Sequence, residues 1–205
     1  MKSSFDEDYF ERGVETGASL YSNYRWIPEL TIPLAYEIIK IAGLNEGDRV
    51  LDYGCAKGFL VKAFRLLHID AFGVDISQYA ISKAPQDIEQ YVAVYETAHL
   101  FDRWNLIVAK DVLEHITVAE LHAMLDMFSQ VTPQLLVAVP IGDGEKYNIL
   151  AYELDKTHVI RQTLPWWKEQ MERFGFNVEA RYRWGHIKEN WGSHPEGNGI
   201  LLGKK

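Results

Sequence analysis

The stretch VLDYGCAKGFL, residues 50–60, decides how the rest of the chain folds. Its apolar start is typical of a buried strand, and Gly54 and Gly58 bracket a turn after that strand. Apolar residues at helical spacing follow, so we expect the turn to deliver the chain to a ligand-binding loop that opens a helix. Loops of this kind usually hold phosphates, yet Asp52 places a carboxylate two residues before the first glycine.

Strand and helix patterns alternate along most of the chain. Strands are predicted at residues 49–54, 71–77, 91–95, 104–111 and 134–140. Helices are predicted at residues 31–42, 60–67, 117–128 and 164–174, and another helical stretch begins at residues 80–84. Thr31 is the expected cap of the first helix, and Thr117 with Glu120 forms a capping-box pattern. This alternation predicts an α/β fold, a doubly wound and mostly parallel sheet with helices on both faces.

Two later strands, at residues 177–184 and 199–205, have no helical pattern between them. A parallel pair needs a long crossover, so these strands are predicted to form a C-terminal antiparallel hairpin. The sheet then has seven strands. The main domain is expected to cover residues 31–205, after an aromatic segment at residues 1–30. In such a sheet, ligands bind at the carboxyl ends of the strands, which here also include the loop at residues 141–145.

Composition limits the classes of partner. The formal net charge of −8 argues against a broad nucleic-acid surface, and no apolar run is long enough to span a membrane. The acidic start of the chain does not look like a signal peptide. Cys55 is the single cysteine, which excludes an internal disulfide and favours a reducing, cytoplasmic location. The oligomeric state is left open.

The glycine loop discriminates between cofactors. It lacks the Gly-Lys-Ser/Thr of a Walker loop, and its glycine spacing does not match the dinucleotide pattern G-x-G-x-x-G. Asp52 would repel pyrophosphate, which disfavours an NAD or nucleotide-sugar oxidoreductase. S-adenosylmethionine fits better, because Asp52 can hold its ammonium group and Asp75 can accept the ribose hydroxyls. The alternative is that the glycines form a plain tight turn.

The stretches VLDYGCAKGFL, GVDIS (residues 73–77) and WNLIVAKDVLEHI (residues 104–116) follow in this order. Together they resemble the successive signatures of the class I S-adenosylmethionine-dependent methyltransferases, over about residues 45–180. The chain is most similar to the small-molecule and glycan methyltransferases that have VLEH after the fourth strand. The resemblance implies a Rossmann-like methyltransferase fold. It also implies a set of cofactor-binding residues: Asp52, Gly54, Cys55, Ala56, Gly58, Asp75, Ile76, Glu96, Thr97 and Lys110.

Methyl transfer to a hydroxyl needs a group that removes the proton. His115, in DVLEHI, and His158, in ELDKTHVI, are the leading candidates, and the resemblance puts the segment of His158 beside the substrate pocket. Each histidine has a structural alternative, as a packing or hydrogen-bonding residue. Asp111 and Glu145 are weaker candidates for the base. No metal is expected, because no third ligand is identifiable for Asp111 and Asp143.

Tyr24 and Arg25 stand out in the N-terminal stretch GASLYSNYRWIPE, residues 17–29. Hydroxyls, aromatic rings and one guanidinium are typical of a lid over cofactor and substrate, so these two residues are counted as cofactor-binding. The alternative is that the aromatic residues only pack on the sheet.

The sequence thus predicts an enzyme that methylates a small polar acceptor, with S-adenosyl-L-methionine as cofactor. O-methylation of a sugar or glycan precursor is the favoured reaction, on family similarity alone. The alternative from another class is a catalytically silent scaffold or activator of a partner enzyme. The expected partner is a small-molecule acceptor, with a carbohydrate as the candidate, and neither a nucleic acid nor a membrane is expected.

Overall fold

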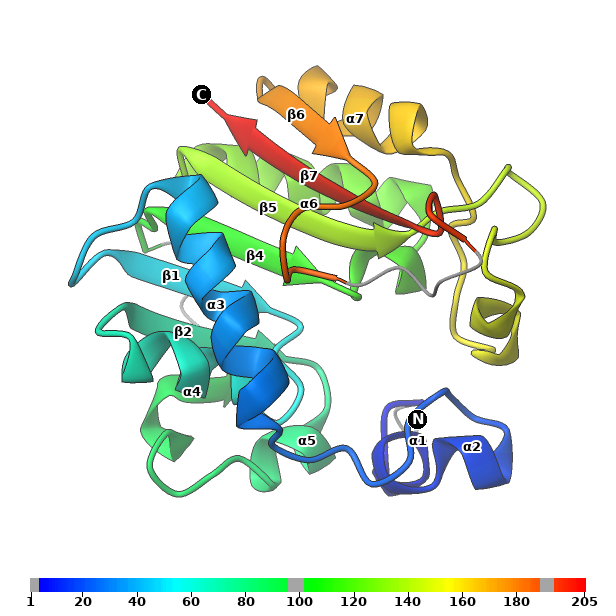
Figure 1. Cartoon of the computed structure of the whole chain (residues 1–205), viewed down its shortest axis with the longest axis horizontal. Coiled ribbons are helices and arrows are strands. Elements are labelled where there is room, and N and C mark those ends of the chain that lie inside the picture. Colours follow the sequence, from blue (N-terminus) through cyan, green and yellow to red (C-terminus); the bar gives the residue numbers. More distant parts are fainter. Residues whose placement is uncertain (1–3, 96–101, 189–193) are drawn as a thin grey trace.

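The computed structural model describes residues 4–95, 102–188 and 194–205. Its centre is a seven-stranded sheet with the order β3-β2-β1-β4-β5-β7-β6 (Figure 1). The strands are β1 (Arg49–Tyr53), β2 (Asp70–Asp75), β3 (Val92–Val94), β4 (Leu106–Lys110), β5 (Gln134–Pro140), β6 (Asn177–Arg181) and β7 (Asn198–Lys204). Strands β1 to β5 pair in parallel, whereas β7 runs antiparallel to both β5 and β6. The predicted doubly wound sheet and antiparallel hairpin are therefore confirmed.

The α-helices of the described residues are α1 (Glu7–Glu11), α2 (Gly13–Thr16), α3 (Pro28–Ala42), α4 (Phe59–Leu66), α5 (Gln78–Ser82), α6 (Val118–Val131) and α7 (Leu164–Arg173). Short 3₁₀ turns are η1 (Glu89–Tyr91), η3 (Leu113–His115) and η4 (Leu150–Leu154). None of the described helices has the length and apolar character of a membrane span.

Two helix starts were predicted from capping patterns, with opposite outcomes. The capping box of Thr117 and Glu120 is present at the start of α6. Thr31, in contrast, lies inside α3, where its hydroxyl donates to the Ile27 carbonyl. The prediction of Thr31 as the cap was wrong because Pro28, whose fixed φ suits a first helical turn, starts the helix earlier.

Successive side chains of the parallel strands pack alternately into two hydrophobic cores, one on each face of the sheet. Val50 and Val108 point to the face covered by α3 and α4, whereas Leu51 and Ile107 point to the face covered by α6 and α7. In Figure 1, α3 crosses in front of the sheet and α6 lies behind it. With both faces covered, the central strands β4 and β5 are buried and apolar along almost their whole length, which makes them easy to recognise in the sequence.

The strand order reverses between β1 and β4, so their carboxyl ends diverge at a switch point. Figure 1 shows α1 and α2 beyond the arrowheads of β1 and β2, at this edge of the sheet. The fold therefore brings the N-terminal segment to the loops that follow β1, β2 and β4.

Gly54, directly after β1, has two reasons to be glycine. Its φ is +80°, and a Cβ there would lie 2.5 Å from Cγ2 of Val112. Gly43 has a similar φ of +69° with nothing within 4 Å of the added Cβ. We expect Gly43→Ala to cost about 1–2 kcal/mol of unfolding free energy from backbone strain. Gly54→Ala should cost about 1–3 kcal/mol more, from overpacking. Urea unfolding of both variants measures the difference; equal losses would contradict the role of Val112.

Candidate functional site

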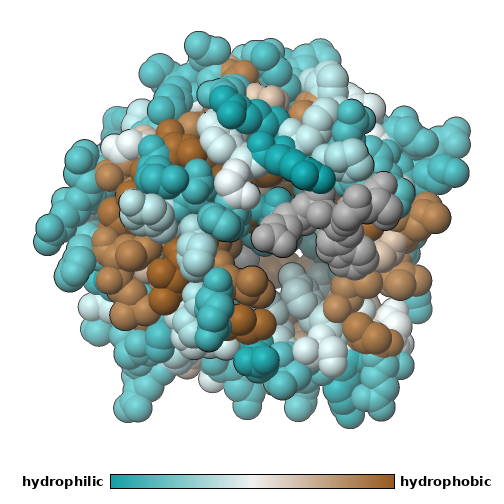
Figure 2. Space-filling model, viewed as in Figure 1, coloured by the Kyte–Doolittle hydropathy of each residue, from teal (hydrophilic) through white to brown (hydrophobic). Residues whose placement is uncertain are grey.

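A cavity of about 1130 Å³ opens at the carboxyl ends of β1, β2 and β4. Figure 2 shows this face of the molecule hollowed in the same region. Its walls come from the N-terminal segment, the start of α3, the loop after β1, the end of β2 and the turn after β4. The sheet and the N-terminal segment thus enclose one space that is large enough for a cofactor and a second small molecule.

Most of the predicted site residues line this cavity: Tyr24, Arg25, Asp52, Gly54, Cys55, Ala56, Asp75, Ile76, Lys110 and His115. Gly58 does not line it, because its position faces Ile88, whose Cδ1 would lie 2.7 Å from an added Cβ. The loop at residues 141–145 does not reach the cavity either. Glu96 and Thr97 lie outside the described residues.

Asp52 is a buried acid on the cavity wall, with only 4% of its surface exposed. Burial raises the pKa of this carboxyl to about 7, although the positive charge of Lys110 acts in the opposite direction. Because burial makes this carboxyl costly to ionise, a cation beside it would stabilise its ionised form. Asp52 is therefore suited to hold a positively charged group.

Asp75 shapes the glycine loop. Its Oδ2 accepts a hydrogen bond from the Ala56 amide at 2.7 Å, and its Oδ1 accepts one from the Ser77 amide at 2.7 Å. These bonds join the loop after β1 to the end of β2. Each carboxylate oxygen can accept a second hydrogen bond, so Asp75 can also bind hydroxyl groups in the cavity.

Asp111, which was considered as a base, lies between two ammonium groups. Lys110 contacts its Oδ2 at 2.5 Å, and Lys188 contacts its Oδ1. The two lysines hold the pKa of Asp111 well below its usual range. Asp111 therefore remains ionised and paired, and it is a poor acceptor for a proton.

The N-terminal segment is attached to the glycine loop. Lys57 Nζ, in the loop, donates to the Tyr24 carbonyl at 2.6 Å and pairs with the Glu11 carboxylate. The Tyr9 hydroxyl donates to Asp155 Oδ2 at 2.9 Å. These contacts make the segment a wall of the cavity, and its aromatic rings also form a small core of their own.

The two candidate histidines lie together, with their ring centres 4.7 Å apart. His158 Nδ1 lies 2.9 Å from the Tyr152 carbonyl, which can only accept, so Nδ1 carries the proton. His115 Nδ1 lies 2.8 Å from the hydroxyl of Thr157, and that hydroxyl donates its own proton to Asp155 Oδ1 at 2.5 Å. Nδ1 of His115 must therefore also carry a proton. In both neutral rings, Nε2 keeps its lone pair.

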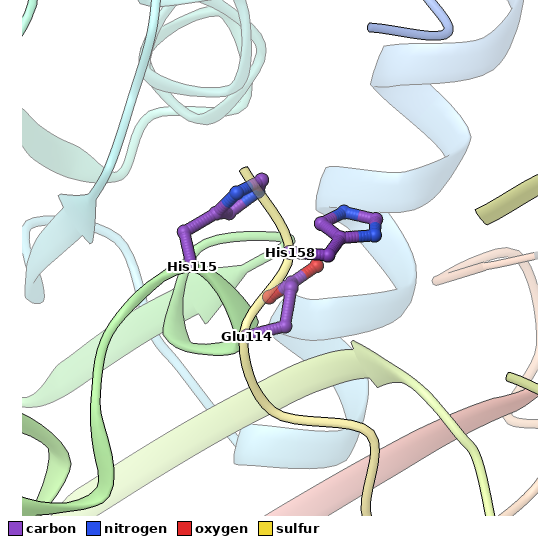
Figure 3. Close-up of side chains that lie close together, drawn as sticks. All are labelled: Glu114, His115 and His158. Atoms are coloured by element: carbon purple, nitrogen blue, oxygen red, sulfur yellow. The ribbon is translucent and has the colours of Figure 1, made fainter. Parts of the chain in front are cut away.

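His115 reaches the cavity wall, whereas His158 lies behind it and is buried. Burial lowers the pKa of both imidazoles, which keeps them neutral at physiological pH. Figure 3 shows the Glu114 side chain directed toward His158, beside His115. The pair is thus supplied with an acidic neighbour that the sequence did not single out.

Sequence reasoning missed three residues at this site. Glu114 precedes His115 in the same motif and was overlooked because exposed acids are common. Lys188 and Tyr9 were overlooked because both are distant in sequence from the residues they contact, Asp111 and Asp155. For Glu114 the useful signal was its position in DVLEHI, directly after two apolar residues and next to His115.

Structural neighbours share the architecture at low sequence identity. A SAM-dependent methyltransferase from Archaeoglobus fulgidus has a TM-score of 0.62 and 16% identity, covering 87% of this chain and 97% of that one. Magnesium protoporphyrin IX methyltransferase from Synechocystis PCC 6803, with bound SAH, has a TM-score of 0.64 and 16% identity, covering 86% and 82%. At this identity the likeness shows the fold alone. No curated protein sequence matches the chain significantly.

A family model described as "Methyltransferase domain" matches residues 31–181, most of the chain. The match contains the glycine loop, Asp75 and the His115 motif, the features that form the cavity. The chain therefore belongs to the methyltransferase-domain family and is a methyltransferase with a Rossmann-like fold and S-adenosyl-L-methionine as its cofactor.

Proposed function

We propose that this enzyme methylates a hydroxyl group of a small polar acceptor, with the hydroxyl seated against His115. The observation that carries the proposal is that His115, a residue of the cavity wall, has its proton on Nδ1, which leaves Nε2 able to accept a proton in a ring that burial keeps neutral. A neutral imidazole with its other nitrogen held as a donor is able to accept the hydroxyl proton.

The chain's own residues fit the cofactor. Asp52 offers a buried carboxylate to the ammonium of its methionine part, and Asp75 has free lone pairs for the ribose hydroxyls. Ile76, 56% exposed at the cavity wall, offers an apolar surface to the adenine. When bound, S-adenosyl-L-methionine supplies an electrophilic methyl group on a sulfonium.

Proton transfer can be supported from behind His115. As Nε2 takes up the proton, the ring becomes cationic. Thr157 and Asp155 then stabilise it, because the Asp155 carboxylate accepts from the Thr157 hydroxyl that holds Nδ1. His158 contributes by packing against the same ring, so we assign it a positioning role in this step.

A sugar or sugar-derived precursor is our candidate acceptor. The cavity wall combines aromatic rings, Tyr21 and Tyr24 among them, with charged side chains such as Arg25 and Lys188. Rings that stack and charged groups that hydrogen-bond suit a ligand with several hydroxyls. The cytoplasmic location and the narrower similarity to glycan enzymes with VLEH remain predictions from the sequence. A silent scaffold would bind the cofactor without forming S-adenosylhomocysteine with any acceptor.

Asp52→Asn tests how the cofactor is held. From pH 7.5 to 6.0 the wild type should lose roughly tenfold in affinity for S-adenosyl-L-methionine, because Asp52, with a pKa of about 7, becomes protonated. Asp52→Asn should bind weakly at both pH values. Isothermal titration calorimetry measures both affinities; a variant that equals the wild type at pH 7.5 would contradict the role of Asp52.

The same carboxyl affects the cofactor-free protein. The pKa of Asp52 rises from 3.8 to about 7 on folding, so its stabilising contribution is complete at low pH and is lost as the pH rises between these values. Asp52→Asn should lack this loss of stability. Its melting temperature should therefore fall less than that of the wild type between pH 5 and 7.5. Asp102→Asn is the matched control, since Asp102 is exposed on the surface.

His115→Asn tests the proton acceptor. The variant should bind S-adenosyl-L-methionine normally and methylate its acceptor about 10²–10⁴ times more slowly. His122→Asn is the control, because His122, on α6, hydrogen-bonds Gln170 of α7 and does not line the cavity. Turnover is followed as S-adenosylhomocysteine release over a panel of sugars and other polyols. Undiminished turnover by His115→Asn would overturn the assignment.

Arg25→Gln tests the wall formed by the N-terminal segment. Arg25 is exposed at the cavity, next to Tyr24, whose carbonyl binds Lys57 of the glycine loop. A guanidinium there can pair with the cofactor's carboxylate, so the variant should bind about 10-fold more weakly. Arg12→Gln, at an exposed pair with Asp8, should not change the affinity. Equal affinities of both variants would leave Arg25 with no part in cofactor binding.

A further inference from the structure

We propose that Glu114, His115 and His158 bind a divalent transition-metal ion, which takes the acceptor hydroxyl as an additional ligand. The role of the ion rests on the proposed O-methylation, but the site itself rests on geometry. One ligand atom from each of the three side chains lies within 4.8 Å of the others. Rotations of these side chains can bring donor atoms at this separation to about 2.1 Å from one ion.

Glu114 provides an independent reason to expect a cation. The residue is 1% exposed, and its Oε2 has no hydrogen-bond partner among the described residues. A buried carboxylate oxygen without a partner is costly and therefore unusual in a native structure. Figure 3 shows one oxygen of this carboxylate directed toward the imidazole of His158, so the buried acid lies among the proposed ligands.

Both histidines are held in the tautomer that a metal requires. His158 donates from Nδ1 to the Tyr152 carbonyl, and His115 donates from Nδ1 to Thr157, which is oriented by Asp155. Metal-binding histidines usually donate their second nitrogen to a carbonyl or to a carboxylate-linked group in this way. The Nε2 atoms are thus left as the ligand atoms.

The backbone fixes the two segments against each other. The Glu114 carbonyl accepts hydrogen bonds from the amides of Val159 at 2.7 Å and Ile160 at 3.0 Å. These two bonds hold the residue after His158 at η3, so the ligands do not need to be brought together from a distance. The arrangement is therefore preorganised before any ion binds.

Two imidazoles and one carboxylate favour Zn²⁺, Mn²⁺ or Fe²⁺ over Mg²⁺ or Ca²⁺, which prefer oxygen ligands. Three protein ligands leave open positions for other groups. Because His115 lies on the cavity wall and His158 behind it, an open position can face the cavity. The site would thus accept an oxygen of the acceptor.

A bound cation would change the role of His115 from proton acceptor to ligand. It would lower the pKa of the acceptor hydroxyl, whose proton leaves to water. The oxygen then forms the new O–C bond while the C–S bond of the methyl donor breaks, and the electron pair stays on sulfur. The products are a methyl ether and S-adenosylhomocysteine, so atoms and charge balance.

The sequence had predicted no metal, with Asp111 and Asp143 as the residues considered. Those two residues give no site, since Asp111 is paired with two lysines and Asp143 is exposed. The proposed ligands are a different set, and only the fold brings His158 to the pair Glu114 and His115.

Calorimetric titration of the full-length, EDTA-treated protein with ZnCl₂ and with MnCl₂ tests the site, without cofactor or acceptor. We expect one equivalent of each ion to bind, Zn²⁺ more tightly than Mn²⁺, and MgCl₂ to give no comparable binding. Glu114→Gln and His158→Asn should each weaken Zn²⁺ binding at least tenfold. His122→Asn should bind like the wild type.

Thermal unfolding and S-adenosyl-L-methionine binding establish that each variant is folded, and Glu114→Gln preserves the shape of the side chain. The proposal is overturned if neither ion binds, or if Glu114→Gln and His158→Asn both bind Zn²⁺ as the wild type does. Failure of metal binding would leave O-methylation with His115 as the proton acceptor intact. Metal binding without turnover on any hydroxyl acceptor would instead contradict the proposed function.

Discussion

The carboxylate of Asp75 is the contact on which the site depends. By accepting from the amides of Ala56 and Ser77, it joins the glycine loop after β1 to the turn after β2. Backbone hydrogen bonds from the amides of Gly54 and Cys55 to the Val74 carbonyl hold the same loop to the end of β2. Because the glycine loop and the turn after β2 are both bound to the Asp75 side chain, this part of the cavity wall has a fixed shape. Carboxylates that accept backbone N–H bonds are well suited to this, since each such bond is charge-assisted.

The next layer is a set of buried charges that are paired across segments. Lys57 joins the glycine loop to Glu11 of the N-terminal segment, and Lys188 brings the segment before β7 to Asp111 after β4. Removing one partner of such a pair leaves an uncompensated buried charge, which is strongly destabilising. These pairs therefore fix the positions of the segments around the cavity relative to one another. The sheet itself is held by apolar packing.

The parts of the fold that sequence predicted are those controlled by local pattern. Burial of Val50 on one face and Leu51 on the other gives β1 two successive apolar residues, and the Thr117 capping box needs only residues within one turn. The prediction from Thr31 was wrong because Pro28 also suits a helix start, and its fixed φ begins α3 three residues earlier. The grouping of Glu114 with His158 was beyond such reasoning, because it depends on the Val159 and Ile160 amides meeting the Glu114 carbonyl.

Glu114 and Asp52 are two buried acids at different places in the site, and they favour different ligands. Burial raises the pKa of each to about 7. A positive charge placed nearby would therefore stabilise the ionised form of either one. Asp52 has Lys110 as an opposing charge, whereas Glu114 lies beside two neutral imidazoles and has Lys188 as an opposing charge. Because ionising a buried acid is costly, such a group favours a ligand whose positive charge reduces that cost. The two acids thus favour positive charge at two different places, which is the basis for proposing an ammonium group beside Asp52 and a metal ion beside Glu114.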